Sequence, residues 1–109
     1  MKFKHAFDGL KLALKEKAVI IQIILGVMAI IGGIIIKLDE HEWLAFVVCI
    51  AGVISLEIMN SVIENLCDLY SKEYNEKIKN IKDMASASVL LFCLGALVVC
   101  IICVLRRVM

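Results

Sequence analysis

Four polar side chains recur at helical spacing within and just beyond one hydrophobic stretch of the sequence. Glu57, Asn60, Glu64 and Asp68 are separated by three, four and four residues. On a regular α-helix these positions fall within an arc of about 80°. We call these four residues the polar stripe. An ionisable side chain inside a membrane span is costly, so the polar stripe is a candidate functional site. Its carboxylates suit a general base and a ligand for a hard divalent cation.

Further polar residues are expected on the same side of the membrane as these four. Lys82, Asp83 and Ser86 surround the start of the last stretch, and Gln22 lies near the start of the first. Carboxylates stacked on one helix face repel one another, so we expect a divalent metal or Lys82 among them. The opposite halves of the stretches are almost wholly apolar. This one-sided distribution favours a reaction site at one membrane interface over a channel through the full thickness.

Three hydrophobic runs must position these residues. The chain has 109 residues, of which 62% are hydrophobic and none is proline, against about 45–50% apolar residues in soluble domains. Residues 18–36, 43–63 and 85–105 are each long enough to cross a bilayer as a helix, and a polar connection covers 64–84. The sequence therefore predicts an all-α integral membrane protein forming a single membrane domain over residues 1–109, and it disfavours a soluble enzyme.

Residues 1–17 have a different pattern. Apolar and charged residues alternate there with helical periodicity, and the two sets are displaced by about a quarter turn: Phe3, Phe7, Leu10 and Leu14 against Lys4, Asp8, Lys11 and Lys15. This predicts an amphipathic helix lying on the membrane surface. The alternative is a disordered basic leader.

Charge sets the expected orientation. The formal net charge is only +1, which disfavours a nucleic-acid partner. Nine Lys residues fall on the side of the N-terminus and the 64–84 connection, whereas the other side holds Lys37, Arg106 and Arg107. The side richer in Lys and Arg is normally cytoplasmic. We therefore expect a multi-pass protein of the bacterial inner (plasma) membrane, with the N-terminus and the 64–84 connection in the cytoplasm.

The chain resembles a family of lipid kinases. The stretch from Glu57 to Asp68 resembles the pattern E-x-x-N-[ST]-x-I-E-x-x-x-D, and Lys82, Asp83 and Ser86 fit a following A-K-D-x-x-[AS]-[AG]. Together these patterns are the signature of the prokaryotic diacylglycerol kinases and their undecaprenol kinase relatives. The order and spacing of the motifs and the three-span plan all agree, over nearly the whole chain.

The resemblance implies a homotrimer of three-span subunits whose active sites are shared between protomers. Such enzymes transfer the γ-phosphate of MgATP, with Mg²⁺ as cofactor and ATP as co-substrate, to the hydroxyl of a membrane lipid. By this resemblance, Glu57 is the general base on the lipid hydroxyl, Asn60 is its orienting partner and Glu64 is a metal ligand.

The remaining roles carried over concern the nucleotide and the lipid. Lys82 is expected to contact phosphate and Asp83 the adenine, while Ser86 joins Glu57 as a lipid contact. The acceptor could be undecaprenol or diacylglycerol. The excess of Lys over Arg and the many Ile residues indicate an AT-rich genome, common among Gram-positive bacteria, which slightly favours undecaprenol.

The first hydrophobic run departs from the family pattern. Relatives show E-x-N-x-R and then a His or Glu, whereas the ungapped equivalents here begin at Lys17 and are otherwise apolar. A shift of one residue restores the carboxylate as Glu16 and places Gln22 at the His or Glu position. We therefore predict that Glu16 is the second metal ligand and that Lys17 contacts an ATP phosphate in place of the missing Arg.

Two other functions remain open at the level of sequence. The altered first run fits a non-catalytic or regulatory relative that keeps the trimer and a metal or lipid site without turnover. A small proton-coupled transporter with Glu57 as the proton carrier is the third possibility, and the one-sided polar distribution counts against it.

Overall fold

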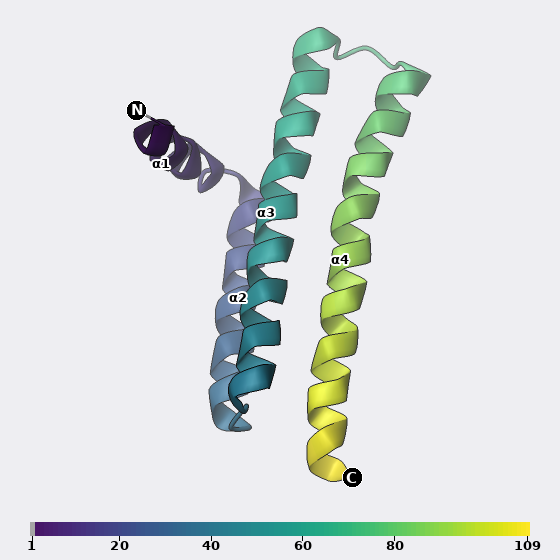
Figure 1. Ribbon diagram of the computed structural model, residues 1–109. Coiled ribbons are helices and arrows are strands. Elements are labelled where there is room, and N and C mark those ends of the chain that lie inside the picture. The colour runs from purple at the N-terminus through teal and green to yellow at the C-terminus, as the bar shows by residue number, and fades with distance from the viewer. Residues whose placement is uncertain (1) are drawn as a thin grey trace.

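Within the residues that the structure describes, the chain folds into four helices joined by short connections. The computed structural model describes residues 2–109, which form α1 (Lys2–Ala13), α2 (Lys17–Ile35), α3 (Glu40–Tyr70) and α4 (Glu76–Val108) with no strand among them. The three long helices α2, α3 and α4 alternate in direction, so that each is antiparallel to the one before it in the sequence. Both α2 and α4 pack against α3 (Figure 1). The helix α1 leaves this bundle at the start of α2, so the bundle proper consists of α2, α3 and α4.

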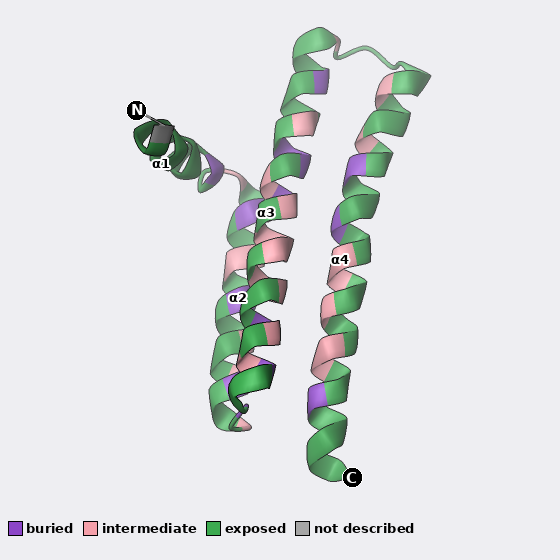
Figure 2. Cartoon of the chain, in the orientation of Figure 1, coloured by how far each residue is buried: buried purple, intermediate pink, exposed green. Residues whose placement is uncertain are grey.

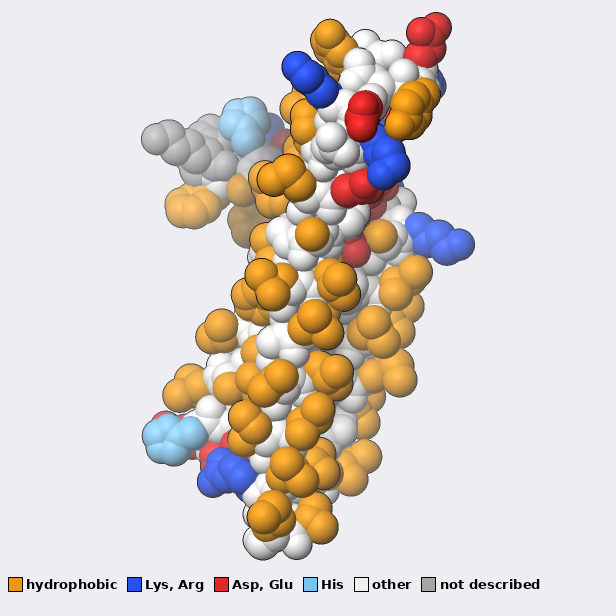
Figure 3. Space-filling model, turned by 90° about the vertical axis from the view of Figure 1, so that its right-hand side faces the viewer, with side chains coloured by type: hydrophobic (Ala, Val, Ile, Leu, Met, Phe, Trp, Pro, Cys, Tyr) orange, Lys and Arg blue, Asp and Glu red, His pale blue; other side chains and the backbone are white. Residues whose placement is uncertain are grey.

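Three of the four helices are long and apolar enough to cross a membrane. Their most apolar 18-residue windows have mean hydropathies of 2.7 for α2, 2.1 for α3 and 3.1 for α4. Hydrophobic side chains cover the middle of the face seen in Figure 3, and charged side chains gather toward its two ends. Most positions on the outer faces of the bundle are exposed, as a lipid-facing surface requires (Figure 2). The predicted all-α membrane fold is confirmed.

The polar connection at residues 64–84 is mostly helical. The helix α3 continues to Tyr70 and α4 begins at Glu76, so only residues 71–75 lie outside the two helices. Asn75 caps α4, because its side-chain oxygen accepts hydrogen bonds from the backbone N–H groups of Lys77 and Ile78 at 2.9 and 3.3 Å. Such a cap satisfies N–H groups that have no partner within the helix. All four residues of the polar stripe therefore lie on α3, which continues as a regular helix beyond its apolar segment.

The junction of α1 and α2 places two of the predicted site residues. Glu16 is the N-cap of α2 and Lys17 is its first residue. Lys17 therefore belongs to the first spanning helix, whereas the sequence pattern placed it at the end of the surface helix. In α1, Phe3 and Phe7 are 74% and 64% exposed. An apolar helix face that the bundle does not cover is what a helix lying on a membrane surface presents.

A Schellman turn ends α2. The backbone N–H of Leu38 donates to the Gly33 carbonyl at 3.1 Å, and that of Lys37 donates to the Ile34 carbonyl at 3.2 Å. The turn requires a left-handed residue, and Lys37 supplies it with φ of 58°. Leu38 folds back over Gly33, where a Cβ would lie 2.7 Å from the leucine Cδ1. Glycine at this position therefore allows the turn to close.

The start of α3 is fixed by a capping box. The Glu42 backbone N–H donates to Asp39 Oδ1 at 2.9 Å, and the Asp39 backbone N–H donates to Glu42 Oε1 at 3.0 Å. Next to this cap, Leu38, Phe46 and Cys103 form a small buried cluster. Further along, Phe92 of α4 lies over Gly52 of α3, where any Cβ would overlap the ring. The capping box and the small cluster close the end of the bundle far from the polar stripe, and the contact of Phe92 with Gly52 lies in the middle of the bundle.

Candidate active site

The polar stripe of α3 is held together by one amide. Asn60 Nδ2 donates to Glu57 Oε2 at 3.2 Å and to Glu64 Oε1 at 3.0 Å. Glu57 and Asn60 are only 8% and 9% exposed, whereas Glu64 is exposed. An amide that donates to two carboxylates offsets part of their mutual repulsion. The stripe is therefore a connected unit running from the apolar interior toward the polar end of α3.

The carbonyl oxygen of the same Asn60 amide has no hydrogen-bond partner among the described residues. Asn60 Oδ1 is buried, and no group among the described residues donates to it. A buried acceptor without a hydrogen bond is destabilising, so such atoms are uncommon in folded proteins. Asn60 Nδ2 is occupied by Glu57 and Glu64, so its Oδ1 is the polar atom of this amide that still lacks a partner among the described residues.

Lys82 reaches the stripe from α4. Its Nζ lies 2.7 Å from Asp68 Oδ1, and this ion pair is partly open to solvent. The hydrogen bond to Asp68 raises the pKa of Lys82, so the ammonium stays charged. The expectation of a cation among the carboxylates thus matches the contact between Lys82 and Asp68, at the solvent-facing end of the stripe.

Asp83 and Ser86 lie on α4 near Lys82 without joining the stripe. The Asp83 carboxylate pairs with Lys79 at 2.7 Å, one turn earlier on the same helix, and both side chains are more than half exposed. Ser86 lies one turn beyond Lys82 and is also exposed. The single chain therefore brings Lys82 to the carboxylates and leaves Asp83 and Ser86 facing outward.

Glu16 is brought to α3 by a residue that the sequence analysis did not select. Asn65 Nδ2 donates to Glu16 Oε1 at 3.0 Å, across 49 positions of sequence. Glu16 and Asn65 line a groove of about 230 Å³ between α1, α2 and α3. Because Asn65 follows Glu64 directly, this contact brings the start of α2 to the level of Glu64. Lys17 is exposed in the first turn of α2.

The described residues contain no cluster of three or more His, Cys, Asp or Glu side chains suited to a metal ion. Glu16 and Glu64 each use one carboxylate oxygen in a hydrogen bond to an asparagine, which leaves the second oxygen of each for another ligand. Mg²⁺ typically keeps several waters and binds through one or two carboxylates together with substrate phosphates. The donor set therefore fits a magnesium ion carried by a nucleotide better than an ion held by protein alone.

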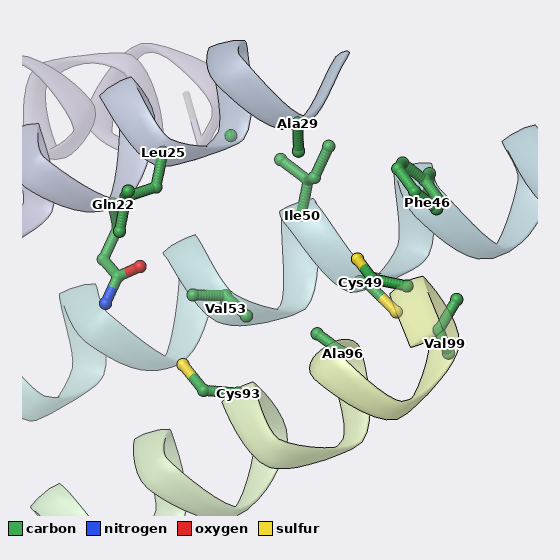
Figure 4. A pocket seen from close by; sticks show the side chains of 12 residues that line it. Gln22, Leu25, Ala29, Phe46, Cys49, Ile50, Val53, Cys93, Ala96 and Val99 are labelled. Atoms are coloured by element: carbon green, nitrogen blue, oxygen red, sulfur yellow. The ribbon is translucent and has the colours of Figure 1, made fainter. Parts of the chain in front are cut away.

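Gln22 lies away from this constellation. It lines an apolar cavity of about 150 Å³ between α2, α3 and α4, together with side chains that include Cys49 and Cys93 (Figure 4). Its single amide among apolar neighbours fits interhelical contact within the bundle. The structure does not bring Gln22 to the carboxylates of the stripe.

The fold and the site define a class of small membrane proteins with three spanning helices and an acidic, partly buried site near one membrane face. A sequence model of the family described as prokaryotic diacylglycerol kinase matches residues 4–104, so the chain belongs to that family. A curated relative, the undecaprenol kinase of Bacillus subtilis (strain 168), is 34% identical over 73 residues. This alignment covers 67% of the chain and 57% of the relative.

Proposed function

We propose that the chain is a lipid kinase that transfers the γ-phosphate of MgATP to the hydroxyl of a membrane lipid. Family membership and the relative named undecaprenol kinase support this activity. The observation that carries it is the buried pair of Glu57 and Asn60, linked to the exposed Glu64 on the same helix face. A base near hydrocarbon and a metal ligand near water are what a lipid kinase needs.

The proposed chemistry begins at Glu57. The lipid hydroxyl donates its hydrogen to a Glu57 carboxylate oxygen, and Asn60 orients that carboxylate through the hydrogen bond that its Nδ2 donates to Glu57 Oε2. The hydroxyl oxygen forms a bond to the γ-phosphorus as its proton passes to Glu57. The bond from the γ-phosphorus to the β-bridging oxygen breaks, and ADP leaves. Catalysis of this type depends mainly on positioning and on charge stabilisation rather than on covalent intermediates.

The remaining residues act on the nucleotide in this proposal. Glu64 and Glu16 would hold a Mg²⁺ ion that neutralises phosphate charge, and Lys82 and Lys17 would contact phosphate oxygens. Asp83 would contact the adenine and Ser86 the lipid. Since Lys82 and Asp83 are paired with Asp68 and Lys79 in the structure, nucleotide binding requires both residues to exchange partners.

The proposal includes the setting of the enzyme. The chain would work as a homotrimer in the bacterial inner membrane, with active sites shared between protomers. The exposed positions of Asp83 and Ser86 fit a site that a neighbouring protomer completes. Undecaprenol is favoured over diacylglycerol, since the curated relative carries that name.

The test is phosphoryl transfer by the purified chain in lipid. Protein reconstituted with undecaprenol or with diacylglycerol is incubated with γ-labelled ATP and Mg²⁺, and the extracted lipids are separated. We expect labelled undecaprenyl phosphate and little labelled phosphatidate. Folded protein that labels neither lipid would contradict the proposal.

A second candidate is a non-catalytic relative. It is favoured by the occupied side chains of Lys82 and Asp83 and by the apolar residues at 19, 21 and 23, where the expected polar pattern is missing. Thermal unfolding with and without MgATP separates the two functions. A lipid kinase should be stabilised by the nucleotide, whereas a relative without a nucleotide site should show no shift while remaining folded.

A further inference from the structure

The far end of the bundle carries a contact that the proposed chemistry does not use. Arg107, near the end of α4, binds both oxygens of Glu42: Nη1 lies 2.7 Å from Oε2 and Nη2 lies 2.6 Å from Oε1. The Glu42 side chain is 3% exposed. Two parallel charge-assisted hydrogen bonds between a guanidinium and a carboxylate are among the strongest and most directional polar contacts in proteins.

The same guanidinium also binds the turn between α2 and α3. Its Nε donates to the Ile36 carbonyl at 2.9 Å and its Nη2 donates to the Lys37 carbonyl at 3.0 Å. Carbonyls at a helix C-terminus have no partner within the helix, and here a side chain from another helix supplies one. One residue of α4 is therefore bound to the end of α2 and to the start of α3, and we call this set of contacts the Arg107 clamp.

The apolar part of α4 offers little else that fixes its position along α3. Across the described residues, the polar side-chain contacts from α4 to the rest of the chain lie at its two ends, at Lys82 and at Arg106 and Arg107. Between them, the Phe92 ring of α4 packs directly over Gly52 of α3. In lipid, no hydrophobic force favours packing of apolar helix surfaces on one another over packing on acyl chains, so interhelical hydrogen bonds and close contacts at small residues carry more of the association. The axial position of α4 therefore depends strongly on its ends.

The two ends differ in strength. The ion pair of Lys82 and Asp68 is single and its side chains are 35% and 47% exposed, and exposed pairs of this kind are weak. The Arg107 clamp has four hydrogen bonds to groups outside α4 and a nearly buried carboxylate. Between Lys82 and Arg107, α4 is one uninterrupted helix, so a shift at one end moves the other.

We propose that Arg107 is a positioning residue, which sets the axial position of α4 on α3. It thereby sets the position of Lys82 beside the polar stripe, at the opposite side of the membrane. The kinetic part of this inference rests on the proposed function, in which Lys82 contacts phosphate. The structural part does not, because it concerns only the distance between α3 and α4 at their polar ends.

The structural test measures that distance directly. Spin labels are attached at Leu69 of α3 and Met84 of α4, which are 85% and 73% exposed, in protein whose five native cysteines are replaced by alanine. The labelled protein is diluted with unlabelled protein in lipid nanodiscs, and the distance distribution is recorded by pulsed electron paramagnetic resonance. Arg107→Met should move the main peak by about 1.5 Å or more, the rise of one helical residue.

Two further variants make this test decisive. Arg106 is the matched control, because its contacts to Asp39 and Glu42 are longer, at 3.3 and 3.2 Å, and its side chain is 55% exposed. Arg106→Met should leave the peak in place. Arg107→Lys keeps the charge without the forked geometry and should move the peak part of the way, and it decides the matter if Arg107→Met does not fold. An unmoved peak in the Arg107 variants, or an equal movement in Arg106→Met, overturns the proposal.

The kinetic test separates positioning from simple loss of folded protein. Arg107→Met should raise the KM for ATP by about tenfold or more, as misplacement of a contact residue by an ångström can do, and leave the KM for the lipid unchanged. Partial unfolding would lower kcat without changing either KM. If the wild-type protein transfers no phosphate, the proposed function fails, and the spin-label distances still decide whether the Arg107 clamp positions α4.

Discussion

Glu57 and Glu64 are two carboxylates with different surroundings on one helix face. Glu57 is nearly buried, whereas Glu64 is exposed, and Asn60 binds both. Two carboxyl groups in unlike environments can take the separate roles of base and metal ligand. Asn60 holds the two carboxylates at a fixed separation, so its amide supports both the proposed base and the proposed metal ligand.

The first prediction concerns the proposed base. Glu57→Gln keeps the volume of the side chain and its ability to accept the hydrogen bond from Asn60, but removes its basicity. Phosphoryl transfer should fall roughly 10²–10⁴-fold, the usual effect of losing a general base, while insertion and assembly persist. The measurement is kcat with labelled ATP, with Glu40→Gln at the opposite end of α3 as the control. Turnover near that of the wild type would make Glu57 a structural residue.

The second prediction concerns the start of α2. Glu16 is placed at the level of Glu64 by its hydrogen bond to Asn65, so Glu16→Gln should raise the Mg²⁺ concentration required for half-maximal activity. Lys17→Met should raise the KM for ATP, because a cation near the phosphates is lost. Lys15→Met, which removes an exposed charge two residues earlier, should change neither. Wild-type Mg²⁺ and ATP dependence in both test variants would remove the start of α2 from the nucleotide site.

The stripe could be predicted from sequence because its members share one helix, where spacing alone decides which side chains face the same way. The contact between Glu16 and Asn65 could not, since it depends on how α2 packs against α3. The contact between Arg107 and Glu42 joins positions 65 residues apart. Polar residues at helix ends are common, and nothing in their spacing shows which of them will pair across the bundle.

At the scale of elements, the turn after α2 predicts a stabilising substitution. Lys37 adopts a left-handed conformation, which costs a residue with a Cβ about 1–2 kcal/mol and costs glycine almost nothing. Lys37→Gly should therefore raise the free energy of unfolding by about 1 kcal/mol, measured by denaturation in detergent. Lys37→Ala removes the same charge but keeps the strain, so it should give no comparable gain. Equal effects of the two variants would contradict this explanation.

The start of α3 predicts a pH dependence. Glu42 lies in the first turn of α3, before the apolar segment at residues 43–63. Hydrogen bonding to the Arg107 guanidinium, aided by the Asp39 backbone N–H, lowers the pKa of Glu42 from 4.5 to about 2. A carboxyl group whose pKa is lowered on folding stabilises the folded state above its unfolded pKa and loses that effect as the pH falls through the folded pKa.

Glu42→Gln should therefore lower the melting temperature at pH 7, because the amide cannot form the ion pair. The difference from the wild type should shrink as the pH falls from about 4.5 toward 2, where the wild-type carboxyl group is itself protonated. Thermal unfolding in detergent across this range is the measurement, with Glu40→Gln as the control. A difference that is the same at pH 7 and at pH 2.5 would show that the charge of Glu42 does not stabilise the fold.

At the scale of the whole molecule, the charged groups lie at two ends with different compositions. The end with the polar stripe also carries most of the lysines, whereas the far end carries three Lys or Arg residues, two of which are paired with Asp39 and Glu42. Arg106 and Arg107 are basic residues on the side expected to be external, and so they count against the expected orientation. Both are engaged in ion pairs within the fold. This accounts for their presence on that side without a reversed topology.

The last prediction is the topology itself. The excess of lysine on one side predicts that the N-terminus and residues 71–75 are cytoplasmic and that the turn at residues 36–39 is outside. Single cysteines replacing Lys72 and Glu40, both exposed, are introduced separately into protein without native cysteines and treated with a membrane-impermeant maleimide in intact cells. The Glu40 position should react at once, and the Lys72 position only after the membrane is permeabilised. Reaction of both positions in intact cells would contradict the three-span arrangement, and the reverse order would place the polar stripe away from cytoplasmic ATP, which the proposed kinase requires.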